Sequence, residues 1–235
     1  MIEQIYFIDI ETVPNYSSFS EAPEIEQELW AKKTRFVQQS EEKTAAELYQ
    51  RAGIYSEFGK IICISVGIIK MKENEPHFYQ KSFFGHNEKE ILLEFVASLQ
   101  DFEKKKKEVI LCAHNGKEFD YPFIARRMLI NRIKLPKTLD IAGKKPWEVP
   151  HLDTMEMWKF GDYKHFTSLN LLAYLFDIPS PKDDIDGSQV ANVYYIDKNL
   201  DRIEQYCRKD VLTVAQVFLK YKFLESIKSE NITQK

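Results

Sequence analysis

The stretch that decides the fold is Phe7-Ile8-Asp9-Ile10-Glu11-Thr12, which ends an apolar run that begins at Ile5. Because alternate side chains of a strand share a face, we expect Asp9 and Glu11 to point the same way. A run without polar alternation is typical of a central strand covered on both faces, where a carboxylate needs a partner. Two anions about 4 Å apart at an effective dielectric near 20 repel by roughly 4 kcal/mol, which favours a divalent metal between them. The alternative is that both acids close the strand in a solvated turn before Pro14.

The length and net charge of the chain limit the number of domains and the ways in which it can bind nucleic acid. The 235 residues have room for one sizeable domain, and we expect residues 1–235 to form a single one. The formal net charge of −3 provides no general attraction to nucleic acid, so any such binding has to come from a local basic patch and metal ions.

The cysteines and the hydropathy pattern bear on the compartment. Cys63, Cys112 and Cys207 are isolated, which argues against zinc sites and a disulfide framework and favours a reducing cytoplasm. The first residues lack the basic region of a signal peptide. The longest apolar run, Ile61 to Ile69, has the length of a strand, so we expect no membrane span.

Residues 14–60 interrupt the strand pattern. Glu24 to Gln39 and Glu41 to Arg51 carry helical periodicity, with Ser40 as the expected N-cap of the second helix. We therefore predict a helical insertion between the first two strands, which is either a solvated decoration or a lid over Asp9 and Glu11.

The rest of the chain alternates strands and helices. Strands are predicted at 61–69 and 77–84 as a hairpin, at 109–113, and at 151–154 as a short edge strand. Helices are predicted after Asn87, which forms a capping pair with Glu90, and at 117–128, 167–176 and 200–227. Residues 180–188 have the composition of a turn, with acids that cap and face solvent. This order predicts an α/β fold with a mixed sheet.

Two later stretches carry further acids. Asp120 lies in the first turn of the helix that follows the strand at 109–113, and ligands of α/β sheets bind beyond the carboxyl ends of adjacent strands, so Asp120 is placed to share a crevice with Asp9. Tyr206 and Asp210 are four residues apart and share one helix face. Taken singly, Asp120 also suits compensation of the helix dipole, and a Tyr/Asp pair on one helix is commonly incidental.

Together the three stretches resemble the exonuclease motifs of the DEDD superfamily of 3′-5′ exonucleases. The wording FIDIET, HNGKEFDYPFIARRM and YCRKDV is most similar to the proofreading exonuclease domain of family-B DNA polymerases and to small stand-alone proteins like it. The resemblance covers nearly all of the chain apart from 14–60, and no polymerase domain accompanies it. It implies a ribonuclease H-like fold with a mixed central sheet flanked by helices. Gln205 stands where another branch has histidine, whereas Tyr206 matches the tyrosine branch.

The resemblance also implies a two-metal mechanism with two Mg²⁺ or Mn²⁺ ions. Asp9 would hold both ions, Glu11 and Asp210 would complete the site of the first, and Asp120 would hold the second. Tyr206 has an ordinary pKa near 10, so it is a poor base at neutral pH and is expected to position the attacking water.

Substrate contacts are expected from Asn115, Phe119, Lys117 and Arg126, with Arg127 nearby. For Phe119 we favour core packing over base stacking, and for the basic residues a solvated helix face is the alternative. Asp153 resembles an auxiliary Asp-Thr pair of the family and is expected to support the fold. His114 and His151 are interpreted as hydrogen-bonded structural residues.

We therefore expect a metal-dependent 3′-5′ exonuclease that acts on single-stranded 3′ ends, with DNA favoured over RNA, and releases nucleoside 5′-monophosphates. One alternative is an RNA exonuclease of the same superfamily. Another is a nucleic-acid-binding module without turnover, and the presence of all four acids and Tyr206 argues against it. The sequence does not indicate an oligomeric state.

Overall fold

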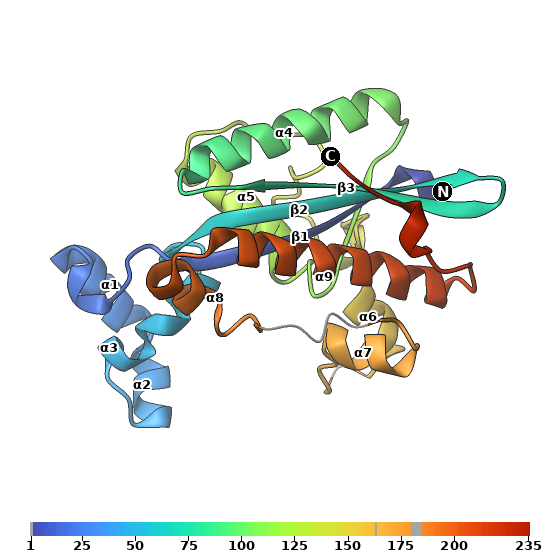
Figure 1. The fold of residues 1–235 in the computed structure, drawn as a ribbon. Coiled ribbons are helices and arrows are strands. Elements are labelled where there is room, and N and C mark those ends of the chain that lie inside the picture. The colour runs from blue at the N-terminus through green and yellow to red at the C-terminus, as the bar shows by residue number, and fades with distance from the viewer. Residues whose placement is uncertain (1, 163, 180–184) are drawn as a thin grey trace.

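The computed structural model describes residues 2–162, 164–179 and 185–235. Within them the core is a six-stranded sheet with the order β5-β4-β1-β2-β3-β6 (Figure 1). The strands are β1 (Ile5–Pro14), β2 (Gly59–Lys72), β3 (Glu75–Phe84), β4 (Ile110–Ala113), β5 (Leu152–Asp153) and β6 (Ile232–Gln234). β1 pairs antiparallel with β2 and parallel with β4, and β3 pairs parallel with β6, so the sheet is mixed as predicted.

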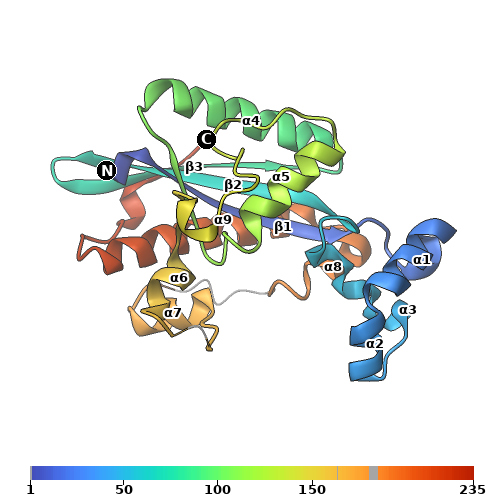
Figure 2. The same cartoon turned by 180° about the vertical axis from the view of Figure 1, so that it is seen from behind.

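Helices cover both faces of the sheet. The main ones are α4 (Glu88–Lys105), α5 (Asp120–Ile130) and α9 (Leu200–Tyr221). Figure 2 shows α4 and α5 on one face, with α9 on the other. The shorter helices are α6 (Thr154–Lys159), α7 (Leu169–Leu175), α8 (Val190–Asn192), the π-helical turn η5 (Val193–Asp197), and the 3-10 turns η1 (Ile2–Gln4), η2 (Phe19–Glu21), η4 (Pro146–Glu148) and η6 (Ser229–Asn231). In the described parts of the chain, no helix has both the length and the apolar character needed to cross a membrane.

The alternation along β1 fixes the position of its acids. Tyr6, Ile8 and Ile10 are buried in the apolar core formed with α4 and α5. Ile5 and Phe7 are buried on the opposite face, in the core formed with α9. Because side chains alternate between the two faces, the odd-numbered Asp9 and Glu11 continue the row that faces α9. The prediction of a central strand covered on both faces is confirmed.

The insertion between β1 and β2 is helical, as predicted. It contains α1 (Glu24–Lys33), α2 (Arg35–Glu41), α3 (Ala45–Leu48) and the 3-10 turn η3 (Tyr49–Ile54), and it projects beside the end of β1 (Figure 1). Trp30, Tyr49 and their neighbours form a small apolar cluster of its own.

The helix start predicted at Ser40 is wrong. α2 continues through Ser40 and ends where Glu42 takes a left-handed φ of 54°. The next helix, α3, has Thr44 as its N-cap instead. The Thr44 hydroxyl accepts from the main-chain N–H of Glu47, and the Glu47 carboxylate accepts from the main-chain N–H of Thr44. This reciprocal capping box satisfies two helix-end donors, which Ser40 inside α2 cannot do.

The C-terminal region also differs from the prediction. α9 ends at Tyr221 rather than at residue 227, and Phe223 takes a left-handed φ of 53°. The chain then turns back, and the Gln216 side chain bonds the main chain of Ile227 at 2.8 and 2.9 Å. This return brings β6, which the sequence analysis missed, beside β3. Of the predicted turn at 180–188, residues 180–184 lie outside the described residues, and Asp186 accepts from the Ser188 N–H as expected of a capping acid.

A buried ion pair joins the insertion, α4 and α5. Arg127 donates from Nε and an Nη atom to both oxygens of Glu88, at 2.8 and 2.6 Å, and from its other Nη atom to the main-chain oxygen of Ser56. Glu88 also accepts from the N–H of Ile61 at the start of β2. Arg127 therefore supports the fold, which corrects its expected place in a basic cluster for substrate.

We predict that Glu88→Ala lowers the free energy of unfolding by about 3–5 kcal/mol, because it leaves the buried Arg127 guanidinium without its partner. Urea unfolding measures this change. Asp101→Ala is the matched control, since it breaks the exposed Asp101–Lys104 pair on the same helix and should cost about 0–1 kcal/mol. Equal losses in the two variants would contradict a structural role for the buried pair.

Candidate active site

One cavity gathers the five residues predicted to be catalytic. It has a volume of about 510 Å³, and Asp9, Glu11, Asp120, Tyr206 and Asp210 all line it. They come from three elements: β1 supplies the first two, α5 supplies Asp120, and α9 supplies the last two. Asp120 reaches the cavity because it begins the helix that follows β4, the parallel neighbour of β1.

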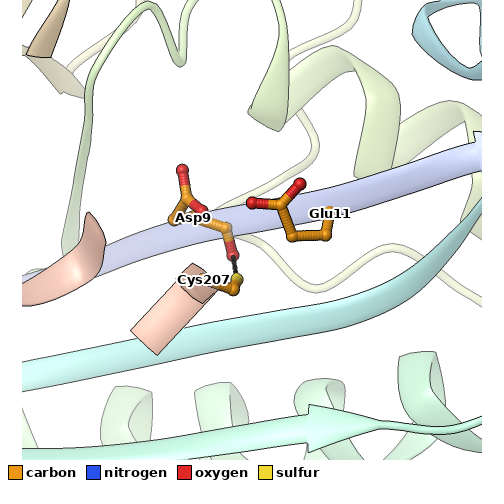
Figure 3. A group of neighbouring side chains, drawn as sticks. All are labelled: Asp9, Glu11 and Cys207. Carbon is orange, nitrogen blue, oxygen red and sulfur yellow. Dashed lines mark hydrogen bonds between the residues drawn. The ribbon is translucent and has the colours of Figure 1, made fainter. Parts of the chain in front are cut away.

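Asp9 and Glu11 form the floor of this cavity. Figure 3 shows their carboxylates on β1, with Cys207 of α9 next to the Asp9 main chain. One ligand atom from each of the three residues lies within 4.8 Å of the others. Asp9 Oδ2 is buried and has no hydrogen-bond partner in the described structure. An unpartnered buried carboxylate oxygen is costly, so this atom calls for a cation or another donor.

Cys207 stabilises the main chain at Asp9 and is not suited to be a metal ligand. Its thiol donates to the main-chain oxygen of Asp9 at 3.4 Å. Burial raises the pKa of this thiol well above its ordinary value, so the sulfur stays protonated. Hard divalent cations prefer carboxylate oxygens, which leaves the neighbouring acids as the donor set for a metal.

Burial raises the pKa of each of the four acids in the cavity, and the nearby negative charges add to this effect for Asp9 and Glu11. Burial, followed by the charges of Glu11, Asp120 and Asp210, raises the pKa of Asp9 well above its usual 3.8. Burial also raises the pKa of Glu11, with Asp210 as the next cause. The same desolvation raises the pKa of Asp120 to about 8 and that of Asp210 to about 6. The protein alone therefore disfavours four negative charges here, and a divalent cation would restore them.

Tyr206 is coupled to Asp210 on the same face of α9. A hydrogen bond from its hydroxyl lowers the pKa of Asp210, partly opposing the effect of burial. Burial first, and then the negative charge of Asp210, raise the pKa of Tyr206 above its ordinary 10. Tyr206 thus keeps its proton throughout the neutral range.

The loop after β4 is held by Asp153, whose carboxylate accepts hydrogen bonds from main-chain N–H groups. Its Oδ1 accepts from the N–H groups of Asn115 and Met155, both at 2.9 Å, and its Oδ2 accepts from the N–H of Lys117 at 3.1 Å. Asn115 has a left-handed φ of 63°, and its Oδ1 is buried without a partner. The expected supporting role of Asp153 is consistent with these bonds, and the Asn115 amide is left available at the cavity.

Gly116 and His114 complete this loop. A Cβ on Gly116 would lie 2.4 Å from the Ala113 side chain, so a larger residue would displace the loop. His114 bonds the Thr154 hydroxyl and the main-chain oxygen of Thr167, both at 2.9 Å, and burial lowers its pKa. His151 is likewise hydrogen-bonded to the N–H of Leu111, so both histidines have the structural contacts that were predicted.

The predicted substrate residues divide between two cavities. Asn115 and Phe119 line the acidic cavity, and the Phe119 ring also packs on Phe123 with centroids 5.3 Å apart. Lys117 and Arg126 line a neighbouring cavity of about 540 Å³ instead, which shares Asn115 with the first. Lys117 there pairs with Glu156 at 2.5 Å.

Sequence reasoning missed one wall of the acidic cavity. Gln50, Arg51 and Ile54 of η3 line it from the insertion. Gly187 and Ser188 line it from the segment before α8, and Ala191 lines it from α8 itself. The insertion was considered as a lid, but its periodicity does not indicate which turn meets the site. The packing of η3 against β1 places Gln50, Arg51 and Ile54 at the cavity, and the sequence pattern does not predict this packing.

Comparisons with known proteins identify the family of this chain and a similar fold. Residues 54–234 match a family model described as a predicted 3′-5′ exonuclease related to the exonuclease domain of PolB. The family B DNA polymerase from the hyperthermophilic archaeon Pyrobaculum calidifontis has a similar structure, with a TM-score of 0.54 and 12% sequence identity. The similarity covers 93% of this chain and 24% of the polymerase chain, and at this identity it shows the fold alone. No curated protein matches the chain.

We predict that, without divalent ions, the contribution of Asp120 to stability falls as pH rises from about 4 to about 8. Its folded-state pKa of about 8 lies above the ordinary 3.8, so in this window the folded state binds more protons than the unfolded state. Thermal unfolding at a series of pH values across this range measures the effect. Asp120→Asn should flatten the plot of melting temperature against pH. Asp201→Asn should not, because Asp201 is an exposed acid on α9. Added Mn²⁺ should raise the melting temperature more at pH 8 than at pH 5. Identical pH profiles for wild type and Asp120→Asn, with no effect of Mn²⁺, would contradict the ionisation account.

Proposed function

Since the chain belongs to the family of predicted 3′-5′ exonucleases related to the exonuclease domain of PolB, we propose that it removes nucleotides from single-stranded 3′ ends, with DNA as the favoured substrate. Hydrolysis of the terminal phosphodiester bond would release nucleoside 5′-monophosphates. The family implies a nucleic-acid substrate, and its relation to a DNA polymerase domain supports DNA over RNA.

The observation that carries this proposal is the convergence of Asp9, Glu11, Asp120 and Asp210, with Tyr206, on one cavity. These residues are up to two hundred positions apart in sequence, and each would be costly to bury without a function. A binding module has no need for a cluster of acids, since they repel the phosphates of its ligand. The cluster therefore supports catalysis.

The donor set suits two Mg²⁺ or Mn²⁺ ions. The unpartnered Asp9 Oδ2 and the raised pKa values of the acids support cation binding. Asp9 would contribute to both ion sites, Glu11 and Asp210 would complete one of them, and Asp120 would complete the other. When bound, such ions would neutralise the phosphate and stabilise both the attacking and the leaving oxygen. Because the cysteines are free and buried, we keep the cytoplasm as the expected compartment.

Tyr206 is proposed to orient the attacking water. Its raised pKa excludes it as a general base near neutral pH. The hydroxyl donates a hydrogen bond to Asp210, which leaves the lone pairs of its own oxygen to accept a hydrogen bond from water. A water held in this way presents its own lone pair to phosphorus, which is a positioning effect.

Asn115 and Phe119 are proposed to hold the 3′-terminal nucleotide. The buried, unpartnered amide oxygen of Asn115 can accept from a base or sugar hydroxyl, and its NH₂ group can donate to a phosphate. Phe119 packs against the main apolar core and on Phe123, so the favoured core packing is confirmed. It also contributes to the cavity wall, where we propose that a base stacks on it.

The direct test is a labelled single-stranded oligonucleotide, supplied as DNA and as RNA. Wild-type protein with Mg²⁺ should shorten DNA stepwise from the 3′ end, and EDTA should abolish this. Asp9→Ala should reduce the rate by more than the roughly 10- to 100-fold that loss of a supporting neighbour of a metal site costs, whereas Asp201→Ala should not. An intact strand throughout would favour a non-catalytic binding module, and faster loss of RNA would favour an RNA exonuclease.

Tyr206→Phe removes only the hydroxyl, so we predict that kcat falls by about 10- to 100-fold, the worth of a hydrogen bond to a charged or reacting group. KM should stay close to the wild-type value because the ring remains. Single-turnover kinetics on the same oligonucleotide separate the two effects. Tyr174→Phe is the control, since Tyr174 is exposed on α7 and does not line the cavity. A wild-type kcat in Tyr206→Phe would exclude the positioning role.

A further inference from the structure

The insertion reaches the acidic cavity through η3, and η3 is fixed against the end of β1. A Cβ on Gly53 would lie 3.1 Å from the Val13 main chain and 3.2 Å from the Pro14 ring. A Cβ on Gly59 would lie 2.7 Å from the main-chain oxygen of Gly53. These close approaches need glycine, so the backbone of η3 is packed directly on the strand that carries Asp9 and Glu11.

The other side of η3 is anchored in the apolar cluster of the insertion. Tyr49, the first residue of η3, is buried against Trp30, with ring centroids 5.8 Å apart. Trp30 in turn donates from its indole nitrogen to the main-chain oxygen of Ala45 at 2.8 Å. The turn is thus held from both sides, and the residues between Tyr49 and Gly53 have a defined place at the cavity.

Arg51 lies in this segment and differs in charge from the rest of the cavity wall. Among the described residues that line the cavity, Arg51 is the single lysine or arginine, and it shares the cavity with four carboxylates. Burial lowers the pKa of His114, so that imidazole adds no positive charge at neutral pH. A substrate strand carries a negative charge at every phosphate, and phosphates beyond the reach of cations held by the acids need another positive partner.

The position of Arg51 is set by Glu41 at the end of α2. The two Nη atoms of Arg51 donate to the two oxygens of Glu41 at 2.6 and 2.9 Å. Lys43 donates to the same carboxylate at 2.9 Å but does not line the cavity. An exposed ion pair of this kind is worth about 0–1 kcal/mol. A phosphate can therefore readily replace the Glu41 carboxylate as the partner of the guanidinium, or bind the guanidinium together with Glu41.

We propose that Arg51 binds a backbone phosphate of the single-stranded substrate, and that the insertion thereby supplies a cationic side chain to the wall of the substrate site. This inference rests on the proposed function and adds a contact that lies outside the residues matched by the family model, 54–234. Gln50 and Ile54, which flank Arg51 on the same turn, would border the strand with a polar and an apolar surface.

The test compares Arg51→Ala with two matched controls, Lys43→Ala and Glu41→Ala. Each is measured for kcat/KM on single-stranded DNA. Each is also measured for binding of a labelled oligonucleotide across a range of salt concentrations, in an Asp210→Asn background that prevents cleavage. Arg51→Ala should lose about 10- to 100-fold in kcat/KM. It should also reduce the slope of log binding constant against log salt by about 0.7, the value for one phosphate contact on a single strand.

The controls separate substrate binding from fold support. Glu41→Ala breaks the same ion pair but keeps the Arg51 charge, and Lys43→Ala removes an equally exposed cation, so both should keep the wild-type salt slope. Arg51→Lys should recover part of the binding, since it keeps the charge but not the planar fork. A salt slope in Arg51→Ala equal to that of the controls, with wild-type protein active, would overturn this inference alone. Wild-type protein that neither cleaves nor binds DNA would overturn the proposed function as well.

Discussion

The mutual repulsion of four buried or half-buried carboxylates is the constraint on which this structure depends. Asp9, Glu11, Asp120 and Asp210 line one cavity, where burial raises the pKa of each acid. Such a cluster opposes folding unless protons or cations neutralise it. The surrounding structure must therefore be rigid enough to hold the acids together in the absence of ligands, and that rigidity would prepare the cavity for the proposed metal ions and phosphate.

The scaffold supplies this rigidity through neutral and paired contacts. Asp153 uses both oxygens to fix the loop that contains Asn115 and leads to Asp120. The Cys207 thiol ties α9 to the main chain of Asp9. The buried Arg127–Glu88 pair, which also bonds the chain at Ser56 and Ile61, locks α4 and α5 to the start of β2. Asp153, Cys207, Glu88 and Arg127 are not among the residues that line the acidic cavity, although the charge of Asp153 still contributes to the raised pKa of Asp120.

Local patterns predicted the parts of the fold that depend on local geometry. The run at 5–12 placed Asp9 and Glu11 on one face because strand alternation is a property of the backbone, and the spacing of Tyr206 and Asp210 placed both on one face of α9. Pairings between distant residues were missed. β6 exists only because its three residues meet β3, Arg127 is neutralised by an acid 39 positions away, and Arg51 meets the cavity through close packing at Gly53. Sequence periodicity carries no signal for such contacts.

The central claim is that the four acids form one site for divalent cations. The most direct measurement is a crystal structure of the protein with Mn²⁺ and a nucleoside 5′-monophosphate, in which anomalous scattering locates the metal. The account predicts Mn²⁺ at about 2.0–2.2 Å, the range of oxygen ligands for small divalent ions, from oxygens of Asp9, with Glu11, Asp120 and Asp210 completing the coordination and the phosphate bound to the metal. Anomalous peaks absent from this cavity, or Asp120 and Asp210 turned away from Asp9, would contradict it.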